Sequence, residues 1–481
     1  MTILDSGAGA HVLVFPFPSQ GHMIPLLDLT HQLATRGLSI TVLVTPQNLS
    51  LLNPLLSKHP SIRTLVLPFP PHPSIPAGVE NSKDLSGKYF GAMLITLGEL
   101  YNPIVDWFRT HPSPPVAIIS DMFLGWTQQL ACELGIHRVV FSPSGAMSLS
   151  AMYSLWRDLP KIEDPTNLKA TICFSKMPNS PVLAWWQVSG LYRRYIERAP
   201  FSEFTKDIFR GNIASWGLVI NSFTELERDY LDYLANELGH DRVWDVGPLH
   251  FLDGEKSGLM DRGGPSSVSA DDILTWLDTC GDNTVVYACF GSQAVLNNRQ
   301  MEGLALGLEK SGARFIWSIK EPTNEHVEGD HWALPPGFED RVAGTGRGLI
   351  IRGWSPQVMI LSHRAVGAFL THCGWNSILE GLVAGVSMLA WPMAADQFLN
   401  SILLVNELKV AVKVCEGAES VPDSTELARA VTLSVSENWA ARERVTELRR
   451  AALEAIKPGG SSAKNLDALV KYLSEFNLQE K

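Results

Sequence analysis

The chain has 481 residues, 45% of them hydrophobic and 19% charged, so it can bury more than one core, and two domains are expected. Acidic residues outnumber basic ones by 50 to 39, and the formal net charge of −11 disfavours a nucleic acid or an anionic membrane as a partner. The six cysteines form no Cys-x-x-Cys pair, and the first residues show no signal-peptide pattern, which predicts a cytoplasmic protein with reduced thiols.

The first half of the chain opens as a βαβ unit. A strand is expected over residues 12–17, an amphipathic helix over about 23–34, and a second strand over 38–44. This spacing predicts a parallel sheet that is covered on both faces. A later strand, residues 116–121, ends in the carboxylate of Asp121.

The second half repeats this scheme with a strand at 285–290, a helix at about 299–309 and a strand at 314–318. Residues 247–265 are rich in turn-forming residues and are expected to be a linker. The expected organisation is therefore an N-terminal Rossmann-like domain over 1–246, a C-terminal Rossmann-like domain over 266–460, and a final helix within 461–481 that packs back on the N-terminal domain. Ligands of such domains bind at the carboxyl ends of the parallel strands.

The most unusual stretch is T-H-C-G-W-N-S-I-L-E-G at 371–381, between an apolar strand and the start of a helix. Backbone N–H groups at a helix N-terminus lack partners within the helix, so this junction predicts an anion site, with phosphate as the expected ligand. Asn376 and Ser377 supply further donors, and Glu380, one turn later, can accept hydrogen bonds from ribose hydroxyls. Taken alone, Asn376 and Ser377 are more typical of an ordinary helix cap.

Two neighbouring strand ends carry complementary side chains. The strand at 348–353 leads into Trp354-Ser-Pro-Gln357, which offers an aromatic face for a base and polar groups for its edge. Pro356 is expected at the first helical position. The strand at 388–393 leads to Asp396 and Gln397, which suit the hydroxyls of a sugar.

Residues 354–397 closely resemble the signature box of plant family 1 UDP-dependent glycosyltransferases of secondary metabolism. The matching motifs are W-x-P-Q, H-C-G-W-N-S-x-L-E, G-V, W-P and D-Q, in this order. The resemblance implies a GT-B fold, in which two Rossmann-like domains with parallel sheets face each other across a cleft and the C-terminal domain holds the UDP-sugar. The chain departs from the family pattern at Ser355, where Ala is more frequent, and at Ser387, where Pro is usual.

The resemblance also implies a role for each matching residue. Trp354 would stack on uracil, Ser355 and Gln357 would contact the base and ribose, and Glu380 would hold the ribose hydroxyls. The residues implied to contact the diphosphate are His372, Asn376, Ser377 and Ser292 of the F-G-S turn. The residues implied to contact the sugar are Trp375, Asp396 and Gln397.

The stretch P-S-Q-G-H-M-I-P places His22 after the first strand, near the N-terminus of a helix. Such a position favours neutral imidazole, the form that a general base needs. Asp121 is the expected partner, because its carboxylate can hold the ring in one tautomer and stabilise the cation formed in the reaction. In the resembled family a His and an Asp at these positions form a catalytic dyad.

The expected reaction is a direct displacement that inverts the anomeric configuration of the sugar. The chain contains no Asp-x-Asp motif, and neither a metal nor another cofactor is expected, since the UDP-sugar is a co-substrate. In the resembled family, Gln at position 397 usually accompanies glucose transfer, which favours UDP-glucose. UDP-rhamnose, UDP-xylose and UDP-galactose remain alternatives.

The acceptor is expected to be a small phenolic molecule with a free hydroxyl or carboxyl group. Phe123 and Trp126, with Trp185 and Trp186, could line an aromatic pocket, or they could belong to the core. Residues 72–80 resemble the subgroup that acts on flavonols and hydroxybenzoates, although a terpenoid acceptor stays possible. A monomer is expected.

Three other classes of protein were weighed against this interpretation. A nicotinamide-dependent oxidoreductase is disfavoured because no G-x-G-x-x-G lies between a strand and a helix. A serine hydrolase is disfavoured because the chain contains no G-x-S-x-G. A non-catalytic nucleotide-sugar-binding protein would keep the signature box but would not need His22 or Asp121, and enzymatic turnover distinguishes it.

Overall fold

The computed structural model describes residues 9–85, 87–251, 266–322, 330, 332–436 and 439–476, which form two compact units. Unit 1 contains the described parts of 1–182, 190–252 and 455–481, and unit 2 contains those of 183–189 and 253–454. Residues 183–189 thus group with unit 2 and 455–460 with unit 1, unlike in the expected division. Most of the expected linker, residues 252–265, lies outside the described residues.

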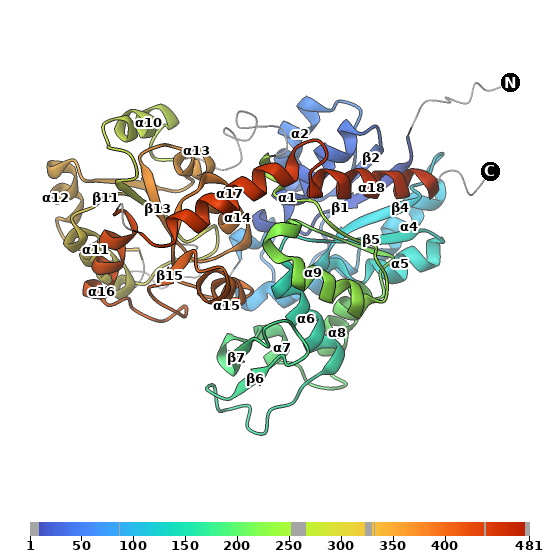
Figure 1. The fold of residues 1–481 in the computed structure, drawn as a ribbon. Coiled ribbons are helices and arrows are strands. Elements are labelled where there is room, and N and C mark those ends of the chain that lie inside the picture. Colours follow the sequence, from blue (N-terminus) through green and yellow to red (C-terminus); the bar gives the residue numbers. More distant parts are fainter. Residues whose placement is uncertain are drawn as a thin grey trace. The chain divides into compact units, whose positions relative to one another are not determined.

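Unit 1 is built on a seven-stranded parallel sheet with the order β3-β2-β1-β4-β5-β8-β9 (Figure 1). In that order the strands are β3 (Arg63–Val66), β2 (Ser39–Val44), β1 (His11–Phe15), β4 (Ala117–Asp121), β5 (His137–Ser142), β8 (Gly217–Ile220) and β9 (Val243–Asp245). A separate two-stranded sheet pairs β6 (Thr171–Cys173) with β7 (Val182–Ala184).

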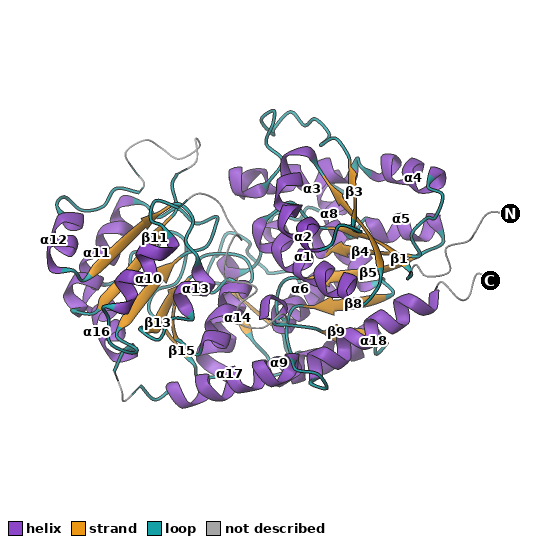
Figure 2. Ribbon diagram, turned by 90° about the horizontal axis from the view of Figure 1, so that it is seen from above, coloured by secondary structure: helices purple, strands orange, loops and turns teal. Residues whose placement is uncertain are grey.

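Helices cover both faces of the large sheet of unit 1 (Figure 2). They are α1 (Gln20–Thr35), α2 (Asn53–Lys58), α3 (Phe90–Gly98), α4 (Tyr101–Thr110), α5 (Thr127–Leu134), α6 (Ala146–Asp158), α7 (Gly190–Arg193), α8 (Pro200–Ile213), α9 (Thr224–Leu238) and α18 (Ser461–Phe476). Short 3-10 helices are η1 (Pro46–Leu52), η2 (Ser82–Asp84), η3 (Gly87–Tyr89), η4 (Met122–Leu124) and η6 (Leu249–Phe251).

The helix α18 completes the core of unit 1 although it lies far along the chain. Leu466, Leu469 and Leu473 are fully buried in the same hydrophobic cluster as the strands β1, β2 and β4. At its start, Ser462 Oγ donates to the carbonyl of Gly247, and Asn465 Nδ2 donates to Asp245 Oδ1 at 2.7 Å. Both apolar packing and hydrogen bonds therefore attach α18 to this unit.

Unit 2 is built on a six-stranded parallel sheet with the order β12-β11-β10-β13-β14-β15. In that order the strands are β12 (Gly348–Arg352), β11 (Arg314–Ile319), β10 (Val285–Cys289), β13 (Val366–Thr371), β14 (Ser387–Ala390) and β15 (Ala411–Lys413). The helices are α10 (Ala270–Asp278), α11 (Asn298–Ser311), α12 (Phe338–Thr345), α13 (Gln357–Leu361), α14 (Trp375–Ala384), α15 (Gln397–Ile402), the π-helix η7 (Leu403–Glu407), α16 (Ser424–Ser434) and α17 (Arg442–Ile456), with the 3-10 helix η5 (Trp185–Gln187).

Alternating residues of the central strand β10 pack on opposite faces of the sheet of unit 2. Val286 and Ala288 belong to the hydrophobic cluster that includes α11 and α16, whereas Val285 and Tyr287 belong to the cluster that includes α10 and α13. This period of two is what a strand buried on both faces requires. Two parallel-sheet α/β units are confirmed.

Several element boundaries differ from the expected ones. The first strand ends at Phe15 because the following Pro16 and Pro18 have no N–H to donate, and β14 ends at Ala390, shortly before Pro392. Pro356 precedes α13 as its N-cap and is not its first helical residue. Within the described ranges, no helix combines the length and apolar character that a membrane span requires.

Candidate functional site

In each unit, two of the predicted site residues lie at the point where the strand order of the sheet reverses. In unit 1, β1 and β4 are neighbours whose chains continue in opposite directions across the sheet, and His22 and Asp121 lie at their carboxyl ends. In unit 2, β10 and β13 have the same relationship, with Ser292 and His372 following them. Such switch points are the usual ligand sites of open α/β sheets.

The structure brings His22 and Asp121 into direct contact. The Nδ1 atom of His22 lies 2.8 Å from Asp121 Oδ2, and the exposed fraction of the side chain is 17% for the histidine and 0% for the aspartate. The second carboxylate oxygen accepts a hydrogen bond from the backbone N–H of Phe123 at 2.9 Å. A carboxylate at Nδ1 keeps the proton on that nitrogen, so Nε2 is left to act as a base.

Behind this pair, the guanidinium of Arg138 in β5 is 1% exposed and donates to neutral oxygens. Its Nε bonds to Ser120 Oγ at 2.8 Å, one Nη bonds to Ser215 Oγ at 2.6 Å, and the other lies 3.3 Å from the backbone carbonyl of Asp121. Burial lowers the pKa of Arg138 to about 10, so it stays charged at neutral pH, and the field of Asp121 favours that charge.

Aromatic rings surround His22 on its own unit. The ring centroid of Phe123 lies 4.9 Å from that of His22, and Phe17 and Phe90 lie 5.3 and 5.0 Å from Phe123. Trp126, predicted with Phe123 to line the acceptor pocket, is 8% exposed and packs against Phe15 instead. The ring of Phe123 therefore contacts the candidate base, whereas Trp126 belongs to the core.

The two other tryptophans that could have lined this pocket lie in unit 2. Trp185 is buried, and Trp186 packs edge-on against Phe398 of α15 with ring centroids 5.0 Å apart.

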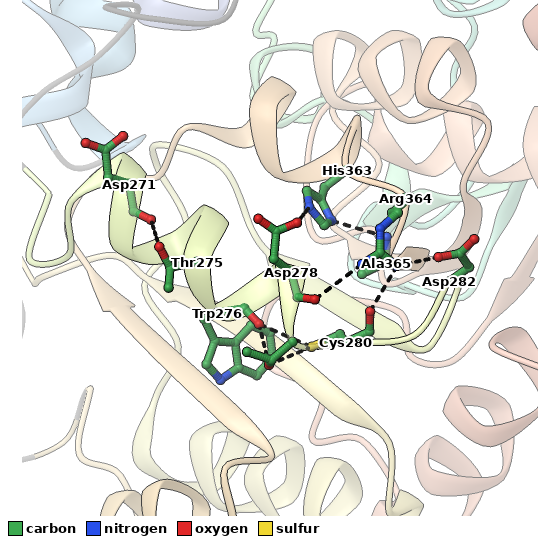
Figure 3. A network of polar contacts seen from close by, with 10 residues as sticks. Asp271, Thr275, Trp276, Asp278, Cys280, Asp282, His363, Arg364 and Ala365 are labelled. Carbon is green, nitrogen blue, oxygen red and sulfur yellow. Dashed lines mark hydrogen bonds and ion pairs between the residues drawn. The ribbon is translucent and has the colours of Figure 1, made fainter.

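A second His–Asp pair lies in unit 2 and provides a useful contrast (Figure 3). His363, just before β13, places Nε2 3.2 Å from Asp278 Oδ1, while its Nδ1 accepts the backbone N–H of Ala365 at 3.2 Å. Asp278 is 70% exposed, and Arg364 bonds to its backbone carbonyl and to Asp282 (Figure 3). This pair lies at the amino end of β13, where it joins the end of α10 to the start of that strand.

Three predicted residues of the nucleotide site form one cluster in unit 2. The amide nitrogen of Gln357 donates to Glu380 Oε2 at 2.6 Å and to Ser377 Oγ at 2.9 Å. Gln357 opens α13, and the other two residues share one face of α14. The half-buried Trp354 precedes this cluster in the loop between β12 and α13.

The side chain of Ser355 points into unit 2. Its hydroxyl lies 2.6 Å from that of Tyr287, and both side chains are buried. The position at which the sequence departs from the family pattern thus has a packing role, and only the main chain of Ser355 is left for a ligand.

His372 lies against the two glycines of the switch point. A Cβ atom built on Gly291 or on Gly374 would come within 2.6 or 2.5 Å of its Nε2 atom, so a larger residue at either position would require the ring of His372 to move. Burial lowers the pKa of His372 to about 4, so the imidazole is neutral at physiological pH. The following residue, Cys373, has a left-handed backbone with φ of 64°, which is rare for a residue other than glycine.

The residues predicted to contact the sugar differ in their hydrogen bonds and in their burial. Gln397 Oε1 accepts backbone N–H groups from Met393 at 2.9 Å and Ala394 at 3.0 Å, so its amide offers a ligand only the NH₂ group and not an acceptor as well. Asp396 Oδ2 accepts from Asn400 Nδ2 at 3.1 Å. Trp375 is 3% exposed, so most of its ring packs inside the unit. Ser292 and Asn376 are half-buried, next to Gly291 and in the first turn of α14.

Sequence reasoning missed several residues that shape these sites. Tyr287 and Arg138 are buried polar residues in strands, and Asn400 is one in α15, a pattern that could have marked them as partners of site residues. Among the described residues, no group of three or more His, Cys, Asp or Glu side chains could hold a metal ion.

Comparison with known proteins identifies the family. The family model for UDP-glucoronosyl and UDP-glucosyl transferase matches residues 259–445. UDP-glycosyltransferase 89B2 of Stevia rebaudiana is 59% identical over 476 residues, which cover 98% of this chain and 100% of that protein. The chain belongs to the UDP-glycosyltransferase family.

Two further relatives agree with this assignment. Flavonol 3-O-glucosyltransferase UGT89B1 of Arabidopsis thaliana is 53% identical over 473 residues, covering 98% of this chain and 97% of that protein. The crystal structure of Arabidopsis thaliana UGT89C1 complexed with UDP-L-rhamnose matches with a TM-score of 0.80 and 42% identity, covering 97% of this chain and 99% of that one. UGT89C1 has also been crystallised with UDP and with quercetin.

The expectation of a plant UDP-glycosyltransferase with the GT-B fold is therefore confirmed. This UDP-glycosyltransferase transfers a sugar from a UDP-sugar donor.

Proposed function

We propose that this enzyme transfers glucose from UDP-glucose to a hydroxyl or carboxyl group of a small plant phenolic, with flavonols as the first candidates. The observation that carries the proposal is the contact between His22 Nδ1 and the buried carboxylate of Asp121, at 2.8 Å. A pair of this kind has no use in a protein that only binds a nucleotide sugar. The glucosyl donor and flavonol acceptor are supported by the relative named flavonol 3-O-glucosyltransferase, at 53% identity.

In this proposal His22 Nε2 removes the proton from the acceptor hydroxyl as the hydroxyl oxygen attacks the anomeric carbon of the sugar. The new C–O bond forms while the bond from the anomeric carbon to the diphosphate oxygen breaks, and its electron pair leaves with UDP. Attack from the face opposite the leaving group inverts the configuration. Asp121 then stabilises the imidazolium that results.

The leaving diphosphate is stabilised by the start of α14, where backbone N–H groups and the positive end of the helix dipole favour an anion. Asn376, Ser377 and Ser292 add polar donors, and His372 contributes an N–H from a neutral ring. Because these donors are fixed before the reaction begins, they can offset the developing charge with little reorganisation. We therefore expect no metal requirement.

The rest of the donor is assigned to the same unit. Trp354 stacks on the uracil, the main chain of Ser355 and the amide of Gln357 contact the base and ribose, and Glu380 accepts from the ribose hydroxyls. Gln357 Nε2 also donates to Glu380 Oε2 at 2.6 Å, so the ribose would compete for or share this carboxylate.

The sugar itself is assigned to Asp396, to the NH₂ group of Gln397 and to the backbone at Trp375. Glucose is preferred over the other donors because the family usually pairs this glutamine with glucose. UDP-rhamnose is the strongest alternative, since UGT89C1, at 42% identity, was crystallised with UDP-L-rhamnose. UDP-galactose and UDP-xylose rank below it.

The acceptor is assigned to the aromatic surface around His22. A flat phenolic ring can stack on Phe123, and Phe90 extends this surface. The loop at 72–80, which resembles the subgroup for flavonols and hydroxybenzoates, is followed by Ser82. The N–H of Ser82 donates to the carbonyl of Pro18, shortly before the helix α1 that carries His22. A terpenoid acceptor is the alternative on this side of the reaction.

We further propose that the enzyme acts in the cytoplasm as a monomer, without a nucleic acid partner or membrane insertion. All six cysteines are free thiols, which suits a reducing compartment. The net charge of −11 is of the wrong sign for nucleic acids and anionic lipids.

The test incubates the purified protein with UDP-glucose, UDP-rhamnose, UDP-xylose and UDP-galactose, each with a panel of flavonols, hydroxybenzoates and terpenoid alcohols. Mass spectrometry of the products is expected to show mainly a hexose on a flavonol. A deoxyhexose or pentose product would overturn the donor assignment, and products from terpenoids alone would overturn the acceptor class.

Calorimetry with UDP in the presence of EDTA tests metal independence, and binding that appears only with Mg²⁺ or Mn²⁺ would contradict it.

A further inference from the structure

The side chain of Asn400 joins two loops of unit 2. Asn400 lies in α15 and is 1% exposed. Its Nδ2 atom donates to the backbone carbonyl of Cys373 at 3.0 Å and to Asp396 Oδ2 at 3.1 Å. One acceptor belongs to residues 372–374, which we call the β13 loop, and the other to residues 391–396, which we call the β14 loop.

Both loops contain a residue in the left-handed backbone region that is not glycine. The φ angle is 64° at Cys373 and 55° at Ala395. Such conformations are unfavourable for residues other than glycine and persist only where surrounding contacts hold them. The β13 loop is held by Asn400 and by the N–H of Cys373, which donates to Thr371 Oγ1 at 3.2 Å. The β14 loop is held by the carboxamide of Gln397 and by the bond from Asp396 to Asn400.

We propose that Asn400 is a positioning residue that fixes the β13 loop and the β14 loop relative to one another. The inference rests on the proposed donor site, in which the β13 loop contacts the diphosphate and the β14 loop contacts the sugar. The bond that breaks in the reaction joins these two groups. A single amide that holds both loops therefore holds the sugar and its leaving group in one relative position.

This role predicts a specific pattern of losses. UDP lacks the transferred sugar and needs only the sites for the base and ribose and the β13 loop, whereas UDP-glucose must engage both loops at once. Removing the amide should therefore impair sugar transfer and the use of UDP-glucose more than it weakens the binding of UDP. Exchanging the NH₂ group for a second oxygen should be at least as harmful, since it would face the carboxylate of Asp396 and the carbonyl of Cys373.

The experiment compares Asn400→Ala and Asn400→Asp with the matched variants Asn406→Ala and Asn406→Asp, because Asn406 is exposed in the following turn of the same helical stretch. Steady-state kinetics give kcat and the KM for UDP-glucose, calorimetry gives the Kd for UDP, and thermal melting checks the fold. We expect kcat of the Asn400 variants to fall by roughly 10- to 100-fold, as small misplacements of reacting groups do. The Kd for UDP should change by less than about threefold, a free energy below that of a single hydrogen bond. The Asn406 variants should match the wild type.

Two outcomes would overturn the inference. Asn400 variants that behave like the Asn406 variants would show that the contact positions nothing, and an equal loss of UDP and donor affinity would indicate a general structural role. If Asn400→Ala does not fold, Asn400→Asp, which keeps the size of the side chain, gives the same comparison.

Asp396→Ala and Gln397→Ala are measured in parallel. If Asp396→Ala and Gln397→Ala both use UDP-glucose as well as the wild type does, the proposed sugar site itself is rejected. If these two variants are impaired while the Asn400 variants are normal, only the positioning role is rejected.

Discussion

The hydroxyl groups of Tyr287 and Ser355 lie 2.6 Å apart in the interior of unit 2. Tyr287 belongs to the central strand β10, and Ser355 follows Trp354 in the loop proposed to hold the base. Burial raises the pKa of Tyr287 well above its ordinary value, so its hydroxyl remains protonated and able to donate. This hydrogen bond therefore attaches the loop to the central strand of the sheet.

Replacing either member of this pair should destabilise the protein, because the remaining hydroxyl would be buried without its partner. Tyr287→Phe or Ser355→Ala should each cost about 1–3 kcal/mol, while the double variant should cost less than the sum of the two. Thermal melting of the four proteins measures this coupling. Strictly additive losses would mean that the two hydroxyls do not depend on each other.

The contact of His22 with Asp121 predicts that transfer depends on both side chains while nucleotide binding does not. His22→Ala should lower kcat by roughly 10²- to 10⁴-fold, the usual contribution of a general base, and leave the Kd for UDP nearly unchanged. Asp121→Asn should also lower kcat, because the ring would lose the acceptor that sets its tautomer.

The second His–Asp pair supplies the control for this experiment. His363→Ala removes a histidine that bonds to Asp278 at the far end of β13 from the proposed site, so it should retain wild-type kcat once thermal melting shows that it is folded. Substantial activity in His22→Ala would require a different base.

Phe123 and Trp126 are close in sequence but should behave in opposite ways. Phe123→Ala removes a ring that lies 4.9 Å from His22, so it should raise the KM for a phenolic acceptor several-fold. Trp126→Ala empties a core position that is 8% exposed and should lower stability by about 3–5 kcal/mol. Acceptor kinetics and thermal melting separate the two effects, and a reversed pattern would place the acceptor elsewhere.

Asp245 predicts a pH dependence of stability in unit 1. Burial raises the pKa of this carboxyl from 3.8 to about 6. Because the folded protein then binds the proton more tightly than the unfolded chain, the contribution of Asp245 to stability is fully present below pH 4 and is lost as the pH rises through about 6.

Asp245→Asn should therefore be more stable than the wild type at pH 8, by up to roughly 3 kcal/mol at about 1.4 kcal/mol per pKa unit. At pH 4 the gain should disappear. Melting temperatures across this range check the prediction, with Asp467→Asn as the control, since Asp467 is 68% exposed where it pairs with Arg36. A gain that is equal at all pH values would exclude ionisation as its cause.

Much of the fold could be predicted because it depends on local patterns. Apolar runs separated by helical periodicity located β1, β10 and α11 to within a few residues. The contact between His22 and Asp121 was also predictable, because both follow neighbouring strands of a parallel sheet.

The rest depends on packing between distant residues, which no local pattern encodes. The alternation along β10 does not reveal that the hydroxyl of Tyr287 contacts that of Ser355. The D-Q motif does not reveal that the side-chain carbonyl of Gln397 accepts a backbone N–H from Met393. Trp126 and Phe123 were predicted together because they are close in sequence. The ring of Phe123 in η4 contacts His22, whereas Trp126, which precedes α5, packs against Phe15.

The burial of α18 in the core of unit 1 bears on how the protein is made. The ribosome releases the strands of unit 1 first, but Leu466, Leu469 and Leu473 emerge only after the whole of unit 2 has been translated. Until then these three leucines cannot cover the part of the core against which they pack. The early half must therefore wait in an incomplete state while the later half is synthesised, and this interval is when chaperones have the greatest opportunity to bind it.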